Sequence, residues 1–336
     1  MRRVACIAFL SLLGVAGTAA QDTPLLSGSV GFVTNTTGGD TTYIPLIQPV
    51  AAVPLGDHFM VESRALVLEE YIPNSGGYDH SHFAALTYLQ GDYIANRHLT
   101  VVGGSFLLPF GTYNERLTPV WISNFEDQPL SVPIGEMSGG TGLGGQVRGS
   151  LFSTAHASFS YAAWFSARSG NEQFNAERST GGRGSFYFPE QRLEVGASYG
   201  RLLQGTHEDF EGGHLWWESK DSAFRLRSEF SRGEHAYGYW FETDYRPFRD
   251  QTEGISFMRR FEPLFRMTQT FRIDNAGSDG APAQNTQRAD FGLDYNLPHN
   301  TRIVTSYSRQ FSPTSNENVW ETGIVYRFLF PAWKGR

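Results

Sequence analysis

The densest group of metal-binding residue types in the sequence is Asp79-His-Ser-His82. On a β-strand, His80 and His82 would lie on the same face, where the two imidazoles could share a metal ion. A solvated loop tip is the simpler interpretation of this group, and it is the one we adopt. The sequence contains no HExxH zinc motif, no phosphate-binding loop and no evident pair of catalytic carboxylates. We therefore predict no enzyme activity, no metal site and no other cofactor.

Arginine and carboxylate side chains share one face of many short segments. Arg192 and Glu194 occupy the same face of one segment, and Arg225, Arg227 and Glu229 that of another. Two roles fit such a mixed face: it can set the field and size limit of a water-filled pore, or it can form a mesh that only stiffens a wall. Both roles are left open here. The candidates for this inward, pore-lining face are Arg64, Arg148, Arg192, Arg225, Arg227, Arg266, Arg272, Arg327, Glu62, Glu194, Glu229, Asp290 and Asp294.

The segments that carry these charges are predicted to be β-strands. Within residues 192–199, apolar side chains occupy every second position and face away from Arg192 and Glu194. This period of two places unlike residues on the two faces of a strand. The same alternation recurs in residues 158–166, 224–230, 237–245 and 290–297. The pattern indicates an all-β chain with one apolar and one polar face.

Aromatic residues gather near the predicted strand ends, at Tyr71, Tyr93, Phe110, Tyr245 and Phe330. A soluble β-sandwich also alternates, with its apolar face inside. Aromatic girdles at both membrane interfaces are typical of a transmembrane barrel instead. We therefore predict an antiparallel transmembrane β-barrel, and a soluble secreted sugar-binding sandwich remains the alternative fold.

Composition narrows the class further. The 336 residues have a mean hydropathy of −0.33, 14% aromatic residues, 37 Gly and 1 Cys. No run of 18 apolar residues occurs, which excludes a helical membrane protein, and the cysteine count excludes a disulfide framework. Residues 1–20 combine a basic start, an apolar run and small residues, as a secretory signal peptide does. Cleavage after Ala20 would leave residues 21–336 as the barrel, with a net charge of −9 because two arginines leave.

The connections between the predicted strands alternate between short and long. Short ones include residues 54–57 and 189–191, whereas long ones include residues 34–41, 70–81 and 108–140. Outer-membrane barrels have short periplasmic turns and longer outer loops, so the pattern predicts about 16 strands. Residues 251–274 break the alternation, because they are too long for one strand and a split at 261–264 spoils the up-and-down order.

The last strand carries the most specific signal. Residues 321–328 read ETGIVYRF, and Leu329 and Phe330 follow. This order of a polar residue, a glycine and alternating aromatics resembles the C-terminal assembly signal of outer-membrane barrels. The signal residues would be Gly323, Tyr326, Phe328 and Phe330, and the implied partner is the barrel-assembly machinery. Six further residues follow Phe330, whereas that signal commonly ends the chain.

The segment 108–140 is the longest connection and is too aromatic and apolar for disorder. A loop of this kind can fold into a wide barrel and narrow the lumen. Its candidate constriction residues are Tyr113, Arg116, Trp121, Phe125, Glu126 and Asp127.

Three stretches resemble the phosphate-selective porin O and P family: GSFLLPFGTYN (104–114), GYWFETDYRP (238–247) and FGLDYNLP (291–298). The resemblance covers about a quarter of the chain, and it implies a porin barrel more strongly than it implies phosphate selection. In that family, phosphate capture is associated with arginine and lysine in the pore. This chain has only Lys220 and Lys334, so a lysine cluster is excluded and only an arginine ladder could serve.

These features predict a porin of the bacterial outer membrane, through which small hydrophilic or ionic solutes diffuse passively. Its partners would be outer-membrane lipid and the solutes themselves, with no nucleic acid, and its oligomeric state is left open between a monomer and a homotrimer. Two other classes remain: a closed structural or adhesion barrel, and a barrel enzyme that acts on lipid and would need a serine, a histidine and a polar residue that orients it.

Overall fold

The structure is a computed structural model, and it describes residues 24–331 except 138, 172–173, 206, 222, 247–256 and 275–278. The predicted signal peptide lies outside the described residues. Sixteen strands form the barrel: β1 (Leu25–Thr37), β2 (Asp40–Leu55), β3 (Phe59–Asn74), β4 (Gly77–Asn96), β5 (Leu99–Leu107), β6 (Thr141–Ser153), β7 (Ser158–Ala167), β10 (Ser179–Phe188), β11 (Leu193–Leu202), β12 (Asp209–Glu218), β13 (Phe224–Arg232), β14 (Ala236–Tyr245), β15 (Phe261–Arg272), β16 (Thr286–Leu297), β17 (Thr301–Phe311) and β18 (Asn316–Pro331).

Five short elements complete the description: β8 (Ser169–Asn171) and β9 (Phe174–Ala176), which pair with each other, α2 (Tyr113–Arg116), α3 (Val132–Gly135) and η2 (Met258–Arg260). None of the helices in the described part of the chain is long and apolar enough to cross a membrane.

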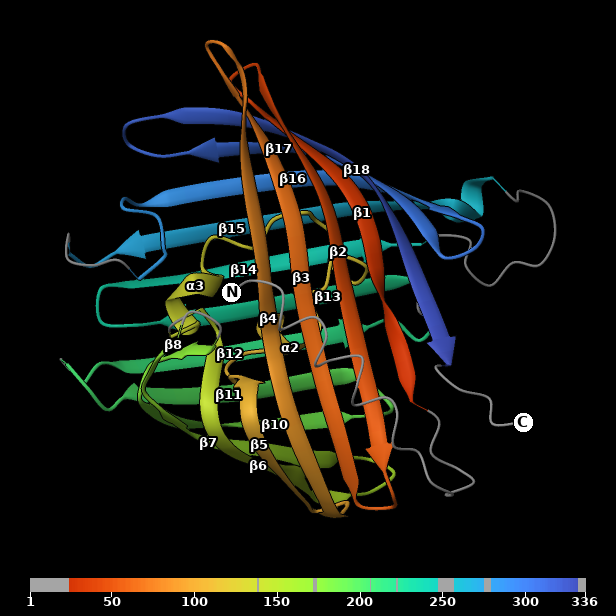
Figure 1. Cartoon of the computed structure of the whole chain (residues 1–336), viewed down its shortest axis with the longest axis vertical. Coiled ribbons are helices and arrows are strands. Elements are labelled where there is room, and N and C mark those ends of the chain that lie inside the picture. The colour runs from red at the N-terminus through yellow and green to blue at the C-terminus, as the bar shows by residue number, and fades with distance from the viewer. Residues whose placement is uncertain are drawn as a thin grey trace, which may run out of the picture.

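The barrel is closed by its first and last strands. β1 pairs antiparallel with β18 over its whole length, from Leu25 opposite Pro331 to Thr37 opposite Val319. Every other neighbouring pair in the circuit is also antiparallel. Figure 1 shows the red β1 beside the blue β18, with the opposite wall behind them. The closed circuit confirms the predicted barrel of about 16 strands and excludes the sandwich.

Alternation places the two faces of the strands as the sequence predicts. In β18, Ile324, Tyr326 and Phe330 are exposed on the outside, whereas Gly323 and Val325 are buried on the inside. The exposed outer face carries large apolar side chains all around the barrel, for example Phe32, Phe165, Phe230 and Phe291. The role of the last strand in assembly stays a prediction.

Two of the predicted outer loops are wrong. β1 and β2 continue to a two-residue turn at Gly38–Gly39, and β3 and β4 continue to Asn74 and Gly77, so residues 34–41 and 70–81 are mostly strand. Both turn glycines have positive φ, 65° and 99°, the conformation that a tight hairpin requires. The polar residues that suggested loops instead extend these two hairpins.

The irregular stretch 251–274 has a simple resolution. β15 starts at Phe261 and runs unbroken to Arg272, so residues 261–264 begin a strand and the chain is not split there. β14 ends at Tyr245 and β15 starts at Phe261, both at the end of the barrel where the other turns are short, and residues 251–256 of the stretch lie outside the described residues. The up-and-down order is therefore kept.

An apolar core lies inside the barrel. Phe110 is 5% exposed and packs with Phe106, Leu108, Trp164 and Phe210, among others, so its placement in an outer aromatic girdle is wrong. A second cluster contains Tyr113, Leu117, Val132, Trp240 and the partly buried Trp216. Both clusters join the segment 108–140 to the inner face of the wall, and the segment is called the inner loop below.

Candidate functional site

The inner loop (Leu108–Gly140) leaves the barrel wall after β5 and returns at β6. Its ends are joined by a hydrogen bond of 2.9 Å from the Leu108 N–H to the Gly140 carbonyl oxygen. Between them the chain passes through α2 and α3, which Figure 1 shows between the two walls of the barrel. Phe125, Ile134 and Leu117 on this loop are each at most 2% exposed. The loop is therefore packed against the wall rather than projecting from it.

Glu229 of β13 holds the start of the inner loop. Its Oε2 accepts the N–H of Thr112 at 2.8 Å, the N–H of Tyr113 at 3.3 Å and the Thr112 hydroxyl at 3.3 Å. Arg183 of β10 donates to the Gly111 carbonyl oxygen at 2.6 Å and pairs with Glu115 at 2.6 Å. These contacts fix the loop on the inner faces of two strands that follow it in the chain.

The middle of the loop is held by an arginine fork. Arg116 makes a bidentate pair with Glu194 of β11, at 2.8 and 2.9 Å. The guanidinium groups of Arg116 and Arg227 lie 5.5 and 4.8 Å from the ring centre of Trp216. Such planar groups stack well on aromatic faces, so charge and aromatic surface alternate along this part of the lumen.

Four charges meet at the tip of the loop. Asp127 pairs with Arg266 of β15 at 2.6 Å and also with Arg288 of β16, and both guanidiniums bind Asp290, at 2.7 and 2.6 Å. Arg266 also lies 4.4 Å from the ring centre of Phe125. The two positive and two negative charges balance, and the desolvated guanidiniums have the carboxylate partners that buried charges need.

The loop also spans the lumen. Arg302 of β17 donates to the carbonyl oxygens of Val120 at 3.1 Å and Ser123 at 2.5 Å. The Val120 N–H donates to Gln48 Oε1 of β2 at 2.9 Å, across the seam that β1 and β18 form. Asn124 donates to Glu242 of β14 at 2.8 Å. β14 and β17 lie on the far side of the strand circuit from β5 and β6, where the loop leaves and rejoins the wall, so the loop crosses the lumen.

The wall of β3, β4 and β6 carries a separate polar group. Asp92 pairs with Arg148 at 2.5 Å and accepts from Gln90 at 3.0 Å, and Gln90 also donates to Glu62 at 3.2 Å. Arg64 is 4% exposed and lies 5.4 Å from the ring centre of Tyr88. Among the described residues, Arg64 has no carboxylate partner, which distinguishes it from Arg148 beside it.

The remaining predicted pore residues lie near the ends of the barrel or outside the loop contacts. Arg192 lies in the turn before β11 and pairs with Glu218 at 2.7 Å. Arg272 pairs with Asp279 at the end of the barrel where the inner loop leaves the wall, which is called the loop-side end below. Arg327 is exposed near the short-turn end. Asp294 is buried and pairs with Arg302 at 3.1 Å. Of the loop residues, Trp121 is partly buried and Glu126 lies beside Gly323.

Burial raises the pKa of two loop carboxyls to about 7. For Glu126, desolvation dominates, Arg302 opposes it and Asp127 adds to it. For Glu136, desolvation dominates and Glu229 adds to it, since both carboxyls line one small pocket. Desolvation also raises the pKa of the buried Tyr113 phenol. The docked loop therefore binds protons that an exposed loop would release.

We expect the inner loop to dock less tightly as the pH rises from about 5 to 7. Glu126 has a usual pKa of 4.5 and a docked pKa of about 7, so its proton favours docking between these values. The protonated Glu126 contributes at most about 3 kcal/mol to the free energy of docking. This contribution is fully present at low pH and is lost as the pH rises through 7. The check is the pH dependence of channel conductance and current noise, with Glu126→Gln flattening the profile. An identical profile in the variant would contradict this role.

Sequence reasoning missed several residues that hold the loop, among them Arg183, Arg288 and Arg302. Each lies on the inward face of a strand, so period-two alternation places it there. Arg288 lies two positions before Asp290, so the alternation that places Asp290 on the inward face places Arg288 there as well. Which arginine meets which loop atom depends on strand register across the barrel, and no local pattern encodes it.

Two groups bear on enzyme chemistry. Ser185 Oγ lies 3.2 Å from His214 Nε2, and Glu194 lies 3.4 Å from the same nitrogen, while Nδ1 has no hydrogen-bond partner among the residues that the structure describes. A serine–histidine–acid relay has the acid at the other ring nitrogen, so this group does not have the geometry of such a relay. On the β3–β4 hairpin, His80 and His82 both contact Glu69 in exposed positions.

Solved structures share the barrel architecture. OmpF of Salmonella typhi, in complex with daunomycin, is 11% identical with a TM-score of 0.61, over 91% of this chain and 97% of that chain. An anion-selective porin from Comamonas acidovorans is 12% identical with a TM-score of 0.58, over 92% and 100%. OccK2 (OpdF) of Pseudomonas aeruginosa, in complex with glucuronate, is 9% identical with a TM-score of 0.53, over 94% and 100%.

No protein-family model matches the sequence, and no curated protein matches it either. At these identities, the likeness establishes a shared fold: a closed 16-stranded antiparallel barrel of the porin type.

Proposed function

We propose that this chain is a porin of the bacterial outer membrane, through which small hydrophilic or ionic solutes diffuse passively. The observation that carries the proposal is the inner loop, which crosses the lumen of a closed barrel and is held by arginine and carboxylate side chains. Such an arrangement narrows a water-filled lumen and gives the narrow part a fixed field. No bond-making chemistry is proposed.

Three features support this role. The outer face of the barrel is apolar and exposed, as a lipid-facing surface is. The barrel closes without a free edge, which is the condition for a sheet to span a bilayer. Solved barrels of the same fold include a protein described as an anion-selective porin. The same proposal includes insertion by the barrel-assembly machinery. It leaves the oligomeric state open between a monomer and a homotrimer.

The deciding experiment is planar-bilayer conductance of the detergent-folded protein across a salt gradient. Discrete current steps are the expected result, and the reversal potential gives the sign of the ion selectivity. No steps from a protein that remains folded would overturn the pore and favour a closed structural barrel or a lipid-acting enzyme.

Charge pairing shapes the proposed solute class. The guanidiniums of Arg116, Arg148, Arg183, Arg266 and Arg288 each bind a carboxylate. An arginine whose fork is filled by a carboxylate offers little to a phosphate, so the phosphate selection implied by residues 104–114 is disfavoured. With a mature net charge of −9 as well, we propose a weak preference for cations.

Asp127→Ala is expected to shift the selectivity towards anions. The change leaves Arg266 and Arg288 facing Asp290 alone, so the tip of the loop gains one net positive charge. The wall pairs stay intact, and the barrel should fold normally. The measurement is the reversal potential in a salt gradient, compared with Glu190→Ala, which removes a carboxylate from an exposed turn pair. Equal reversal potentials in wild type and Asp127→Ala would remove Asp127 from the narrow part.

A further inference from the structure

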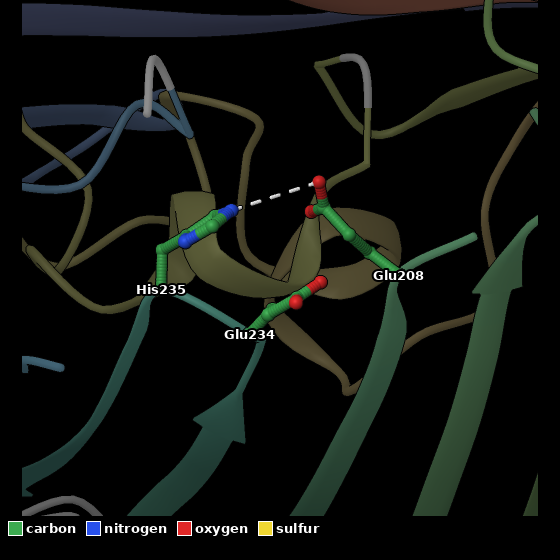
Figure 2. Close-up of side chains that lie close together, drawn as sticks. All are labelled: Glu208, Glu234 and His235. Carbon is green, nitrogen blue, oxygen red and sulfur yellow. Dashed lines mark ion pairs between the residues drawn. The ribbon is translucent and has the colours of Figure 1, made fainter. Parts of the chain in front are cut away.

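Two connections at the loop-side end of the barrel bring three metal-binding side chains together. Glu208 immediately precedes β12, and Glu234 and His235 form the turn between β13 and β14. One ligand atom from each lies within 4.8 Å of the others. Figure 2 shows the two carboxylates and the imidazole directed towards a common space in front of α3.

The spacing of these atoms suits a metal ion. His235 Nε2 lies 3.7 Å from Glu208 Oε1. Bonds of about 2.0–2.1 Å to a tetrahedral ion place neighbouring ligand atoms roughly 3.3 Å apart. Small rotations of the side chains therefore close the group around one ion. Glu234 is exposed and makes no hydrogen bond or ion pair with the described residues, so its carboxylate can turn without breaking a contact.

The histidine is already oriented for this task. Its Nδ1 lies 3.0 Å from both carboxylate oxygens of Asp274, which follows β15. Metal-binding histidines are commonly fixed in this way, with a carboxylate on one ring nitrogen and the metal on the other. Three carboxylates thus surround one imidazole, and the group keeps excess negative charge even when the histidine is protonated.

We propose that Glu208, Glu234 and His235 bind a divalent transition-metal ion of the zinc type, with Asp274 as a positioning residue. One imidazole with two carboxylates favours such an ion, whereas calcium and magnesium prefer oxygen ligands alone. Three ligands leave a coordination position for water, as in open zinc sites. The predicted absence of any metal site would then be wrong.

The position of the site gives the ion a structural effect. The turn that carries Glu234 and His235 also contains Gly233, which lies against Ile134 of the inner loop. α3 contacts β12, β13 and β14, the strands that leave from these same connections. A bound ion would therefore brace the rim at the place where the inner loop returns to the wall. This effect does not depend on whether the lumen conducts.

The experiment is titration of the full detergent-folded chain with zinc ions at neutral pH, by calorimetry and by the thermal midpoint of unfolding. One saturable site and a raised midpoint are expected, because the ion binds the folded state. Glu234→Gln and His235→Ala should each weaken zinc binding at least tenfold, and Asp274→Asn by about 10–100-fold. Calcium and magnesium in place of zinc should bind far more weakly.

Two control variants test other histidines. His156→Ala removes a histidine that has one exposed carboxylate partner, Glu190, at 2.6 Å. A His80→Ala, His82→Ala double variant removes the pair that contacts Glu69. Both should bind zinc as the wild type does. The proposal is overturned if no saturable binding occurs, if binding survives both Glu234→Gln and His235→Ala, or if it is lost only in the His80 and His82 double variant.

Discussion

Replacing Trp121–Pro129 with a short glycine–serine linker is expected to raise the single-channel conductance clearly above that of the wild type. This segment holds the parts of the inner loop that reach furthest across the lumen, including Phe125 and Asp127. Its removal takes away a buried phenylalanine, which alone is worth about 3–5 kcal/mol when truncated. The ion pairs of Asp127 disappear as well, so the rest of the loop loses its hold on β15 and β16.

The strands should close without this segment. Arg266 and Arg288 keep Asp290, and Arg302 keeps Asp294. A matched control replaces Pro313 and Thr314 with glycine and serine, in a connection at the same end of the barrel that the inner-loop contacts do not include. Conductance unchanged by the long replacement, in a folded barrel, would show that the inner loop does not set the size of the pore.

Gly28→Ala is expected to abolish most of the folded barrel. Gly28 lies in β1 at the seam with β18 and has a φ of 147°, a conformation that side chains rarely adopt and that costs about 1–3 kcal/mol. A Cβ there would lie 2.2 Å from the Gln48 carbonyl oxygen, which is backbone and cannot move aside. It would also lie 2.9 Å from the ring of Phe328, which covers the glycine across the seam.

Gly31→Ala is the matched control, three residues further along the same strand. Its added Cβ would meet its nearest neighbour at 3.5 Å, an ordinary contact. The measurement is the fraction of folded barrel, seen as the fast-migrating band in unheated detergent gels. Equal folded fractions for the two alanine variants would show that the seam tolerates a side chain at Gly28.

The sequence alone predicts the barrel well because barrels that span a membrane obey two simple rules. Every strand must be apolar on one face, and every edge must be paired. Residues 321–330 obey both rules, so β18, its faces and its place at the closure could be read directly. The positions at which strands end are harder to predict from the sequence. Residues 34–41 and 70–81 contain turn-forming residues at their centres, but pairing across the hairpin carries the strands almost to those centres.

For the inner surface, the sequence predicts which residues face inward, but not which of them contact one another. Alternation places Arg227, Glu229 and Asp290 inside, where the structure has them buried. The same alternation gives no partner, because partners such as Arg266 and Asp127 are 139 residues apart in the chain. Phe110 shows the limit of composition: an aromatic near a strand end belongs either to a membrane girdle or to an interior core, and only the path of the loop decides.

The separation in sequence between the inner loop and its anchors also fixes an order of events during folding. Apart from Gln48, the strand residues that bind the loop lie on β10 to β17, and Arg302 is 182 residues from Val120. Contacts between residues so far apart in the sequence are expected to form late, because the intervening chain must first lose its conformational entropy by forming strands. We therefore expect the loop to stay undocked until the C-terminal strands have formed. A barrel that closes before the loop docks would have its widest lumen just before it is complete, and docking of the loop would then be the last step of maturation.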